Sequence, residues 1–309
     1  MYPDIVVIGS LNMDLVVRVK KKPEWGETVL GEKFFMGCGG KGANQAFAAG
    51  KLGAKVAMLG CVGQDSFGEK LLENLNNVGV QTKYIKKVQD VSTGVALINI
   101  SSEGQNCIVV DPGANHHVTP DYIQAHADLI GNAKIVLVQL EIPLESVLEV
   151  AKICHQRNVP LLLDPAPAMD LPDDLLGMVD YIVPNESEIS IITGLEVNDI
   201  LSAKNASVYL LNKGVKNVFA KLGANGVVVT NANRVFHIEG YQVETVDTTA
   251  AGDAFAGALA TALVNGNYLW AATQYANAVG ALTVTKSGAQ ESMPSKEEVE
   301  EFIKNNTFQ

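Results

Sequence analysis

The sequence lacks an excess of basic residues and long apolar runs, and both absences restrict its partners. It holds 23 Lys and Arg against 34 Asp and Glu, a formal net charge of −11. A nucleic-acid or anionic-membrane surface needs a basic face, so neither partner is expected. No apolar run is long enough to span a bilayer, and no basic n-region with an h-region precedes the first strand-like run at 5–8. We therefore expect a cytoplasmic protein.

Cysteine is also scarce. The four cysteines are far apart and form no CxxC pair, which fits reduced thiols better than a disulfide framework or a zinc site. The five histidines lack ligand-like spacing as well. What the chain does have is 309 residues with 47% hydrophobic content, enough to bury a large core. We expect one domain over residues 1–309.

Short β-type runs alternate with amphipathic, helix-like stretches along most of the chain. This alternation is typical of an α/β fold in which a mostly parallel sheet is covered by helices on both faces. The strand candidates are 5–8, 56–59, 135–138, 160–163, 181–183 and 218–221.

Two regions interrupt the alternation. Residues 11–36 and 93–111 contain short strand-like runs with Gly-rich turns and no helix between them. These runs could pair into a small second sheet. Near the carboxyl ends of the main strands it would act as a lid over a ligand; the alternative is an extra edge sheet without that role.

The run DTTAAGDAFAG at 247–257 joins a small-residue turn to an acid at a helix start. Apolar residues recur at helical spacing from Ala251 until Asn265. Free backbone N–H groups and the helix dipole attract anionic oxygens there, and small residues let a phosphate approach. Asp253 would stay ionised and could accept a proton from a hydroxyl. The alternative is an acid that only caps the helix.

A second glycine-rich run, GCGGKGANQA at 37–46, leads into another helix. It contains G-x-G-x-x-G, but a dinucleotide fingerprint should follow the first strand, so we treat the match as coincidence. It is not a Walker A loop, because Gly42 follows Lys41. Lys41 and Asn44 could bind a hydroxylated ligand, or the run could be a structural turn.

Polar residues also collect at expected strand ends, where functional residues gather. Asn185 and Glu188 could orient water around Mg²⁺, or could form a capping box at a helix start. The loop 222–226 suits either a hairpin turn or close passage of a nucleotide. The remaining members of this group are Asn12, Asp14 and Glu141.

In their order along nearly the whole chain, these motifs resemble the ribokinase family of carbohydrate kinases. The N-terminal matches are GSLNMD at 9–14, Pro23 with GET at 26–28, and GGKGANQA at 39–46. The later ones are DPAP at 164–167, NESE at 185–188, and 247–257. The resemblance implies a ribokinase-like three-layer sandwich with a small β-sheet lid. It also implies transfer of the γ-phosphoryl group of ATP to O5 of D-ribose.

The resemblance assigns roles residue by residue. Asp253 would be the base, and Ala250, Ala251 and Gly252 would form the anion hole. Ala96 and Val110 would give an apolar lid surface. The sugar hydroxyls would be held by Asn12, Asp14, Gly40, Lys41, Asn44, Glu141 and Asp253. The nucleotide would be bound by Asn185, Glu188, Gly223, Gly226, Gly252 and Asn277.

Ions and partners are implied in the same way. Mg²⁺ would arrive with ATP and meet Glu188 through water, and a homodimer would form through the lid strands. A K⁺ activator would bind Asp247, Thr249, Gly288 and Ser292. Lys221 stands where a small hydroxyl residue is expected, and it could either touch the phosphates or point to solvent. The alternatives are a related kinase for fructose, deoxyribose or a nucleoside, and a non-catalytic sugar-binding protein.

Overall fold

The structure, a computed structural model, describes residues 2–101 and 105–306. Residues 102–104 of the expected lid segment lie outside the described part. Within it, a central sheet has the strand order β14-β13-β12-β11-β10-β9-β1-β4. The strands from β4 to β12 in this order are parallel, and β13 and β14 are antiparallel, which confirms the predicted mostly parallel sheet. The bounds are β1 Ile5–Ile8, β4 Val56–Leu59, β9 Ile135–Val138, β10 Leu161–Leu163, β11 Tyr181–Ile182, β12 Asn217–Lys221, β13 Val227–Asn231 and β14 Arg234–Ile238.

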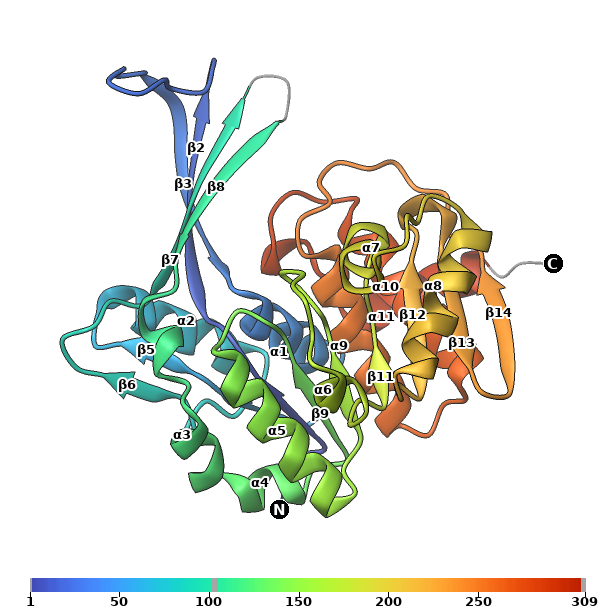
Figure 1. Ribbon diagram of the computed structural model, residues 1–309. Helices are drawn as coiled ribbons and strands as arrows, with labels where there is room; N and C mark the ends of the chain where they lie inside the picture. The colour runs from blue at the N-terminus through green and yellow to red at the C-terminus, as the bar shows by residue number, and fades with distance from the viewer. Residues whose placement is uncertain (1, 102–104, 307–309) are drawn as a thin grey trace.

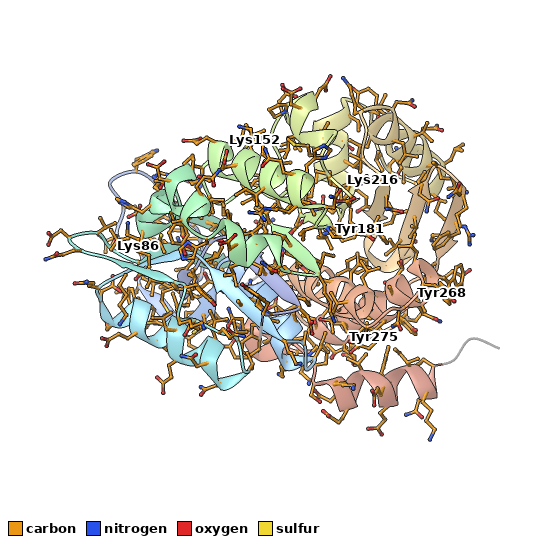
Figure 2. The ribbon with its side chains drawn as sticks, turned by 90° about the horizontal axis from the view of Figure 1, so that it is seen from below. Lys86, Lys152, Tyr181, Lys216, Tyr268 and Tyr275 are labelled. Atoms are coloured by element: carbon orange, nitrogen blue, oxygen red, sulfur yellow. The ribbon has the colours of Figure 1, made fainter. Side chains whose placement is uncertain are left out.

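Two hydrophobic cores cover the two faces of this sheet. Successive strand residues point to opposite faces, so Val6 and Ile8 belong to one core while Ile5 and Val7 belong to the other. Seen from below, Lys152 of α5 and Tyr275 of α10 mark the two helical layers (Figure 2). The helices against the first core are α3 Pro120–Ala125, α4 Ala127–Gly131, α5 Leu144–Arg157, α6 Asp173–Leu176, α7 Glu186–Thr193 and α8 Ile200–Asn212. Those against the second are α1 Lys41–Lys51, α2 Ser66–Asn77, α9 Ala251–Val264, α10 Leu269–Thr283 and α11 Lys296–Asn305.

The two interrupted regions form the predicted second sheet, with the strand order β3-β2-β7-β8. It projects from the body as a long ribbon (Figure 1). Backbone pairing continues beyond the apolar runs, so the strands are longer than predicted, and Asn12 and Asp14 lie on β2 itself. The bounds are β2 Asn12–Val19, β3 Gly31–Gly39, β7 Gly94–Ser101 and β8 Asn106–Asp111.

The smaller elements complete the described chain. β5 Cys61–Gly63 and β6 Lys86–Val88 form a two-stranded sheet. The 3-10 helices are η1 Gly113–His117, η2 Gly223–Asn225 and η3 Gln290–Ser292. η2 lies in the hairpin turn between β12 and β13, one of the two alternatives for this loop. Gly226 adopts φ +84° there, and a side chain would collide with the backbone at the end of β14. In the described residues, no helix is both long and apolar enough to cross a membrane.

Candidate active site

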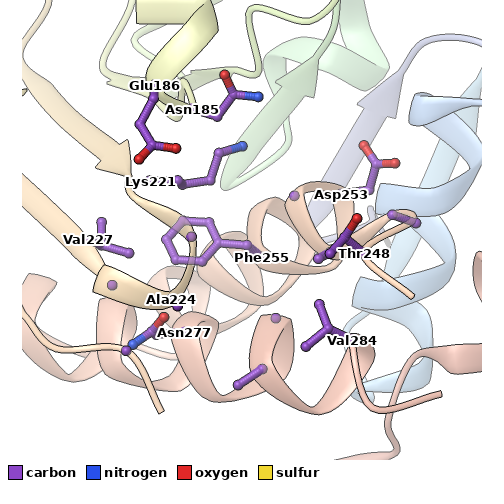
Figure 3. A pocket seen from close by; sticks show the side chains of 18 of the residues that line it. Asn185, Glu186, Lys221, Ala224, Val227, Thr248, Asp253, Phe255, Asn277 and Val284 are labelled. Atoms are coloured by element: carbon purple, nitrogen blue, oxygen red, sulfur yellow. The ribbon is translucent and has the colours of Figure 1, made fainter. Parts of the chain in front are cut away.

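A pocket of about 710 Å³ opens beyond the carboxyl ends of β10, β11 and β12, against the start of α9. This is where open α/β sheets bind ligands. Figure 3 shows Lys221 of β12 reaching into it from one side, and Asp253 and Phe255 of α9 from the other. The expected nucleotide residues all line it: Asn185, Glu188, Gly223, Gly226, Gly252 and Asn277.

The expected anion hole is the turn that begins α9. Ala250 is the N-cap residue and adopts the left-handed conformation with φ +59°, which is uncommon for a residue with a side chain. The first N–H groups of a helix have no partner within it. Ala251 N–H donates to Thr248 O at 3.3 Å within the turn. The turn therefore presents the backbone donor of Gly252 to the pocket, where the helix dipole favours an anion.

Asp253 follows in the first turn of α9 and is only 6% exposed. Asn44 Nδ2 donates to its Oδ2 at 2.9 Å, and Gln45 Nε2 donates to its Oδ1 at 3.2 Å. Burial raises the pKa of Asp253 to about 6, while the Lys41 ammonium opposes this rise. The carboxylate is therefore mainly ionised at neutral pH, as a general base requires.

The expected sugar residues converge on Asp253 from β2, α1 and the end of β9. The backbone N–H of Lys41 donates to Glu141 Oε2 at 3.1 Å, which ties α1 to the end of β9. Gly40 adopts φ +86°, and a Cβ there would lie 2.7 Å from the backbone nitrogen of Asn12. Only glycine at position 40 lets the chain before α1 approach the start of β2 this closely.

Among these residues, Asp14 has the carboxylate whose charged form the site disfavours most. Burial raises its pKa to about 7, and the negative charges of Glu141, Glu291 and Asp253 add to the rise. Strand pairing places Ala96 beside Asp14 and Val110 beside Ala96. Paired residues share a face of a sheet, so the expected apolar lid residues lie on the face that carries Asp14.

Asn185 and Glu188 form the capping box that the sequence left as an alternative. Asn185 Oδ1 accepts from Glu188 N, and Glu188 Oε2 accepts from Asn185 N. Burial raises the pKa of Glu188, and the Lys221 charge opposes this rise. Capping and pocket lining are therefore compatible, because each carboxylate oxygen accepts more than one hydrogen bond.

The side chain of Lys221 points into the pocket and not to solvent. Its side chain is 15% exposed, and its ammonium lies 3.7 Å from Asp164 Oδ1. A Cβ on Gly252 would lie 3.2 Å from the same nitrogen. Lys221 therefore points into the pocket above the anion turn, although a helix N-terminus disfavours a cation.

Three of the four expected K⁺ ligands are joined by hydrogen bonds. Asp247 Oδ1 accepts from Thr249 N at 2.9 Å, and Asp247 Oδ2 accepts from Gly288 N at 3.0 Å. Burial alone would raise the pKa of Asp247, but a hydrogen bond from the Thr249 hydroxyl to Oδ1 at 2.6 Å and these two backbone bonds outweigh it and hold the pKa below its usual value. The Ser292 hydroxyl donates to Ala289 O at 2.8 Å.

Sequence reasoning missed several residues around the base. Gln45 follows Asn44 within a motif that was singled out, and Asp164 begins the DPAP motif, but neither residue was given a role. Gln290 Nε2 donates to Asn44 Oδ1 at 2.9 Å, and Asn115 Nδ2 donates to Asn12 Oδ1 at 2.7 Å. These last two are far from their partners along the chain, so no local pattern indicated them.

Comparison with known proteins agrees with this geometry. Residues 3–296 match the model of the pfkB family carbohydrate kinases. The chain is 42% identical over 301 residues to a ribokinase from Bacillus subtilis, covering 97% of this chain and 99% of that protein. It is 37% identical to a deoxyribokinase from Salmonella typhi, covering 97% of this chain and 98% of that protein. An Arabidopsis thaliana ribokinase solved with ribose and ATP superposes with a TM-score of 0.91 at 34% identity, covering 98% of this chain and 99% of that one.

The environment of Asp14 generates a pH-dependent prediction. Its folded-state pKa of about 7 exceeds that of the unfolded chain, so stability is lost as the pH rises from about 4 to about 7. Asp14→Asn should therefore raise the free energy of unfolding at pH 8 by about 1–2 kcal/mol, a discounted figure because Asp14 is only half-buried. Urea titrations between pH 4 and pH 8 measure the difference in free energy of unfolding between Asp14→Asn and the wild type. This difference should vanish near pH 4.

Asp65 provides a control, because its pKa is shifted in the opposite direction to that of Asp14. It caps α2, and although burial acts to raise its pKa, hydrogen bonds from Thr93 and Gly68 hold the pKa below its usual value. Asp65→Asn should therefore lower stability at neutral pH, with a loss that shrinks on acidification. An Asp14→Asn variant that is equally destabilised at every pH would contradict the assignment.

Proposed function

The chain belongs to the pfkB family of carbohydrate kinases, and on that premise we propose that it phosphorylates D-ribose at O5 with ATP. The products are D-ribose 5-phosphate and ADP. The observation that carries the proposal is the position of Asp253: a buried, mainly ionised carboxylate at the start of α9, between the sugar residues and the nucleotide pocket. Its relatives include ribokinases at about 40% identity over nearly their whole length.

In this proposal Asp253 takes the proton from the 5-hydroxyl of the sugar while the oxygen of that hydroxyl attacks the γ-phosphorus. The bond from the γ-phosphorus to the β–γ bridging oxygen breaks, and ADP leaves. Ala250, Ala251 and Gly252 direct backbone N–H groups at the transferring phosphoryl, where they stabilise its charge. The helix start fixes where these donors lie, so the turn is not rebuilt during the reaction; Ala251 N–H only exchanges Thr248 O for the phosphoryl.

The sugar is held by the polar residues around Asp253. Asn44 is oriented by Gln290 and also contacts Asp253, so it places a sugar hydroxyl beside the base. The four-stranded sheet acts as a lid on a single kinase domain, and excludes water when it covers the sugar. The remaining sugar ligands are Asn12, Asp14, Gly40, Lys41 and Glu141.

Mg²⁺ fits the phosphate side of the pocket. Asp164 Oδ1 is buried and has no hydrogen-bond partner among the described residues, and Glu188 presents a second carboxylate nearby. Glu188 would hold the ion through water, and the ion would supply charge neutralisation of the phosphates. Asn185, Gly223, Gly226, Gly252 and Asn277 bind the nucleotide.

A K⁺ site fits beside the anion turn. Asp247 supplies an ionised carboxylate there, because its hydrogen bonds favour the charged form. Oxygen donors suit this cation: the backbone carbonyls of Thr249 and Gly288 and the hydroxyl of Ser292 complete the proposed set. A cation at this position acts on the backbone that precedes Ala250 and supplies no chemistry to the sugar.

A related acceptor is the second candidate function. A deoxyribokinase is among the relatives, at 37% identity over 97% of this chain. Deoxyribose, fructose or a nucleoside would use the same base and anion turn, so the acceptor must be tested directly. A non-catalytic sugar-binding protein would not need Asp253 and the anion turn together, and both are present.

Dimerisation through the lid is supported by an uncovered apolar row. On the face opposite Asp14, strand pairing aligns Met36, Leu15, Leu97 and Val109, and Val109 is 60% exposed. Exposed apolar patches of this kind mark interaction sites, and a second copy offers a matching row about a two-fold axis.

The free thiols of all four cysteines support a cytoplasmic location.

The acceptor and the cation are tested together. ADP release from MgATP is followed with D-ribose, 2-deoxyribose, fructose and adenosine, each in K⁺ and in Na⁺ buffer. We expect the highest kcat/KM for D-ribose, and faster turnover in K⁺. Preference for another acceptor would keep the mechanism and change the substrate, while no turnover with any acceptor would overturn the proposal.

The base is tested by Asp253→Asn. The amide cannot accept the hydroxyl proton but keeps the shape of the side chain, so kcat should fall by about 100-fold or more while the Kd for the sugar changes little. Steady-state kinetics and sugar binding by calorimetry measure the two effects. Near-normal turnover would remove Asp253 from this role.

The dimer is tested by sedimentation velocity. We expect a wild-type mass near twice 32.9 kDa and dissociation in Val109→Asp, because a buried unpaired charge is strongly unfavourable. Leu201→Asp, at an exposed apolar position on α8, is the matched control and should remain dimeric. A monomeric wild-type protein would contradict the proposal.

A further inference from the structure

Gln45 connects two buried carboxylates beneath the pocket. It lies on α1 and is fully buried. Its Nε2 donates to Asp164 Oδ2 at 2.8 Å and to Asp253 Oδ1 at 3.2 Å. Both hydrogens of one amide nitrogen are therefore committed to two acids that lie on different elements.

The orientation of this amide is fixed by its surroundings. Ionised carboxylates accept hydrogen bonds and cannot donate them, so the nitrogen of Gln45 must face them. On the other side, Gln139 Nε2 donates to Gln45 Oε1 at 2.6 Å. A flipped Gln45 amide would place its oxygen against two acids and lose all three bonds.

This arrangement leaves a buried polar atom unsatisfied. Gln139 Oε1 has no hydrogen-bond partner among the described residues, and the Gln139 side chain is fully buried. An unsatisfied buried acceptor destabilises the folded state, and an apolar side chain of the same size would avoid this loss. The unpaired oxygen follows from pointing the Gln139 nitrogen at Gln45.

We infer that Gln45, oriented by Gln139, is a positioning residue that holds Asp253 ionised and correctly rotated for its role as general base. Two neighbouring carboxylates repel one another, and one of them tends to bind a proton. The shared amide donates to Asp253 and so favours its charged form, while its second bond to Asp164 fixes where the amide lies. Fixing Oδ1 of Asp253 also sets Oδ2, which faces Asn44. The inference rests on the proposed kinase activity.

Other charges around Asp253 act on the same carboxylate. Lys41 of α1 favours its ionised form, whereas Asp164 after β10 and Glu141 after β9 oppose it. Asp14 of β2 is a further acidic neighbour. Lys221 of β12 pairs with Asp164. With three acids opposing ionisation, the two donors from Asn44 and Gln45 matter for the protonation state of the base.

The test is the pH dependence of kcat in Gln45→Met, which keeps the length of the side chain and removes its donors. The acid limb of the profile should move up by about one pH unit, so that kcat falls about 3-fold at pH 6.5 and largely recovers at pH 9. The KM for D-ribose should change little. Gln139→Met should move the limb in the same direction, because the Gln45 amide loses the bond that orients it.

Gln124→Met is the matched control. Gln124 Nε2 donates to Glu149 Oε1 at 2.7 Å on the surface, so this variant loses a glutamine–carboxylate bond away from the pocket and should keep the wild-type profile. A kcat lowered equally at every pH in Gln45→Met, or an unmoved acid limb, would overturn the inference.

A second readout does not depend on activity. Because the Gln45 amide favours the ionised form of Asp253, Gln45→Met should lose more stability at pH 8 than at pH 5 in urea titrations. A loss that is the same at both values would contradict the positioning role. If the wild-type protein fails to phosphorylate any acceptor, the proposed function fails, and this stability difference still tests the contact itself.

Discussion

The close contact between α1 and α9 is the constraint on which the site depends. A Cβ on Gly257 of α9 would lie 2.6 Å from the backbone oxygen of Gln45, and a Cβ on Gly42 of α1 would lie 2.6 Å from the backbone after β1. Glycine at both positions lets α1 fit between the end of β1 and α9. This packing brings Asn44 and Gln45 within hydrogen-bond distance of Asp253.

The charges in this site destabilise the ligand-free protein but complement its ligands. The raised pKa values of Asp14 and Asp253 show that the folded state disfavours these charges, and Lys221 lies beside a helix start that disfavours a cation. Such an arrangement destabilises the empty protein, but an anionic phosphate and a sugar hydroxyl complement it. The large apolar cores on both faces of the sheet support this unfavourable cluster.

The four-stranded sheet and the body share one continuous piece of chain. β1 ends at Ile8 and β2 begins at Asn12, so the strand that leads into the four-stranded sheet also carries two expected sugar ligands into the site. The sheet has two unlike faces: one carries Asp14, and the other carries the uncovered apolar row that includes Val109. In our proposal a single strand thus joins sugar binding, closure and pairing of two copies, because its side chains alternate between the faces.

Local patterns determined the elements. The β-type runs and the helix start at Ala251 follow from periodicity and small-residue turns, and the motifs placed Asn44 and Asp253 at helix starts. Contacts between distant segments were decided only by the tertiary structure: Gln139 against Gln45, Gln290 against Asn44, and Lys221 turned into the pocket. A sequence pattern reports on neighbours within a few residues. The partner of a buried amide and the pKa of a buried acid depend on packing between elements that lie far apart in the chain.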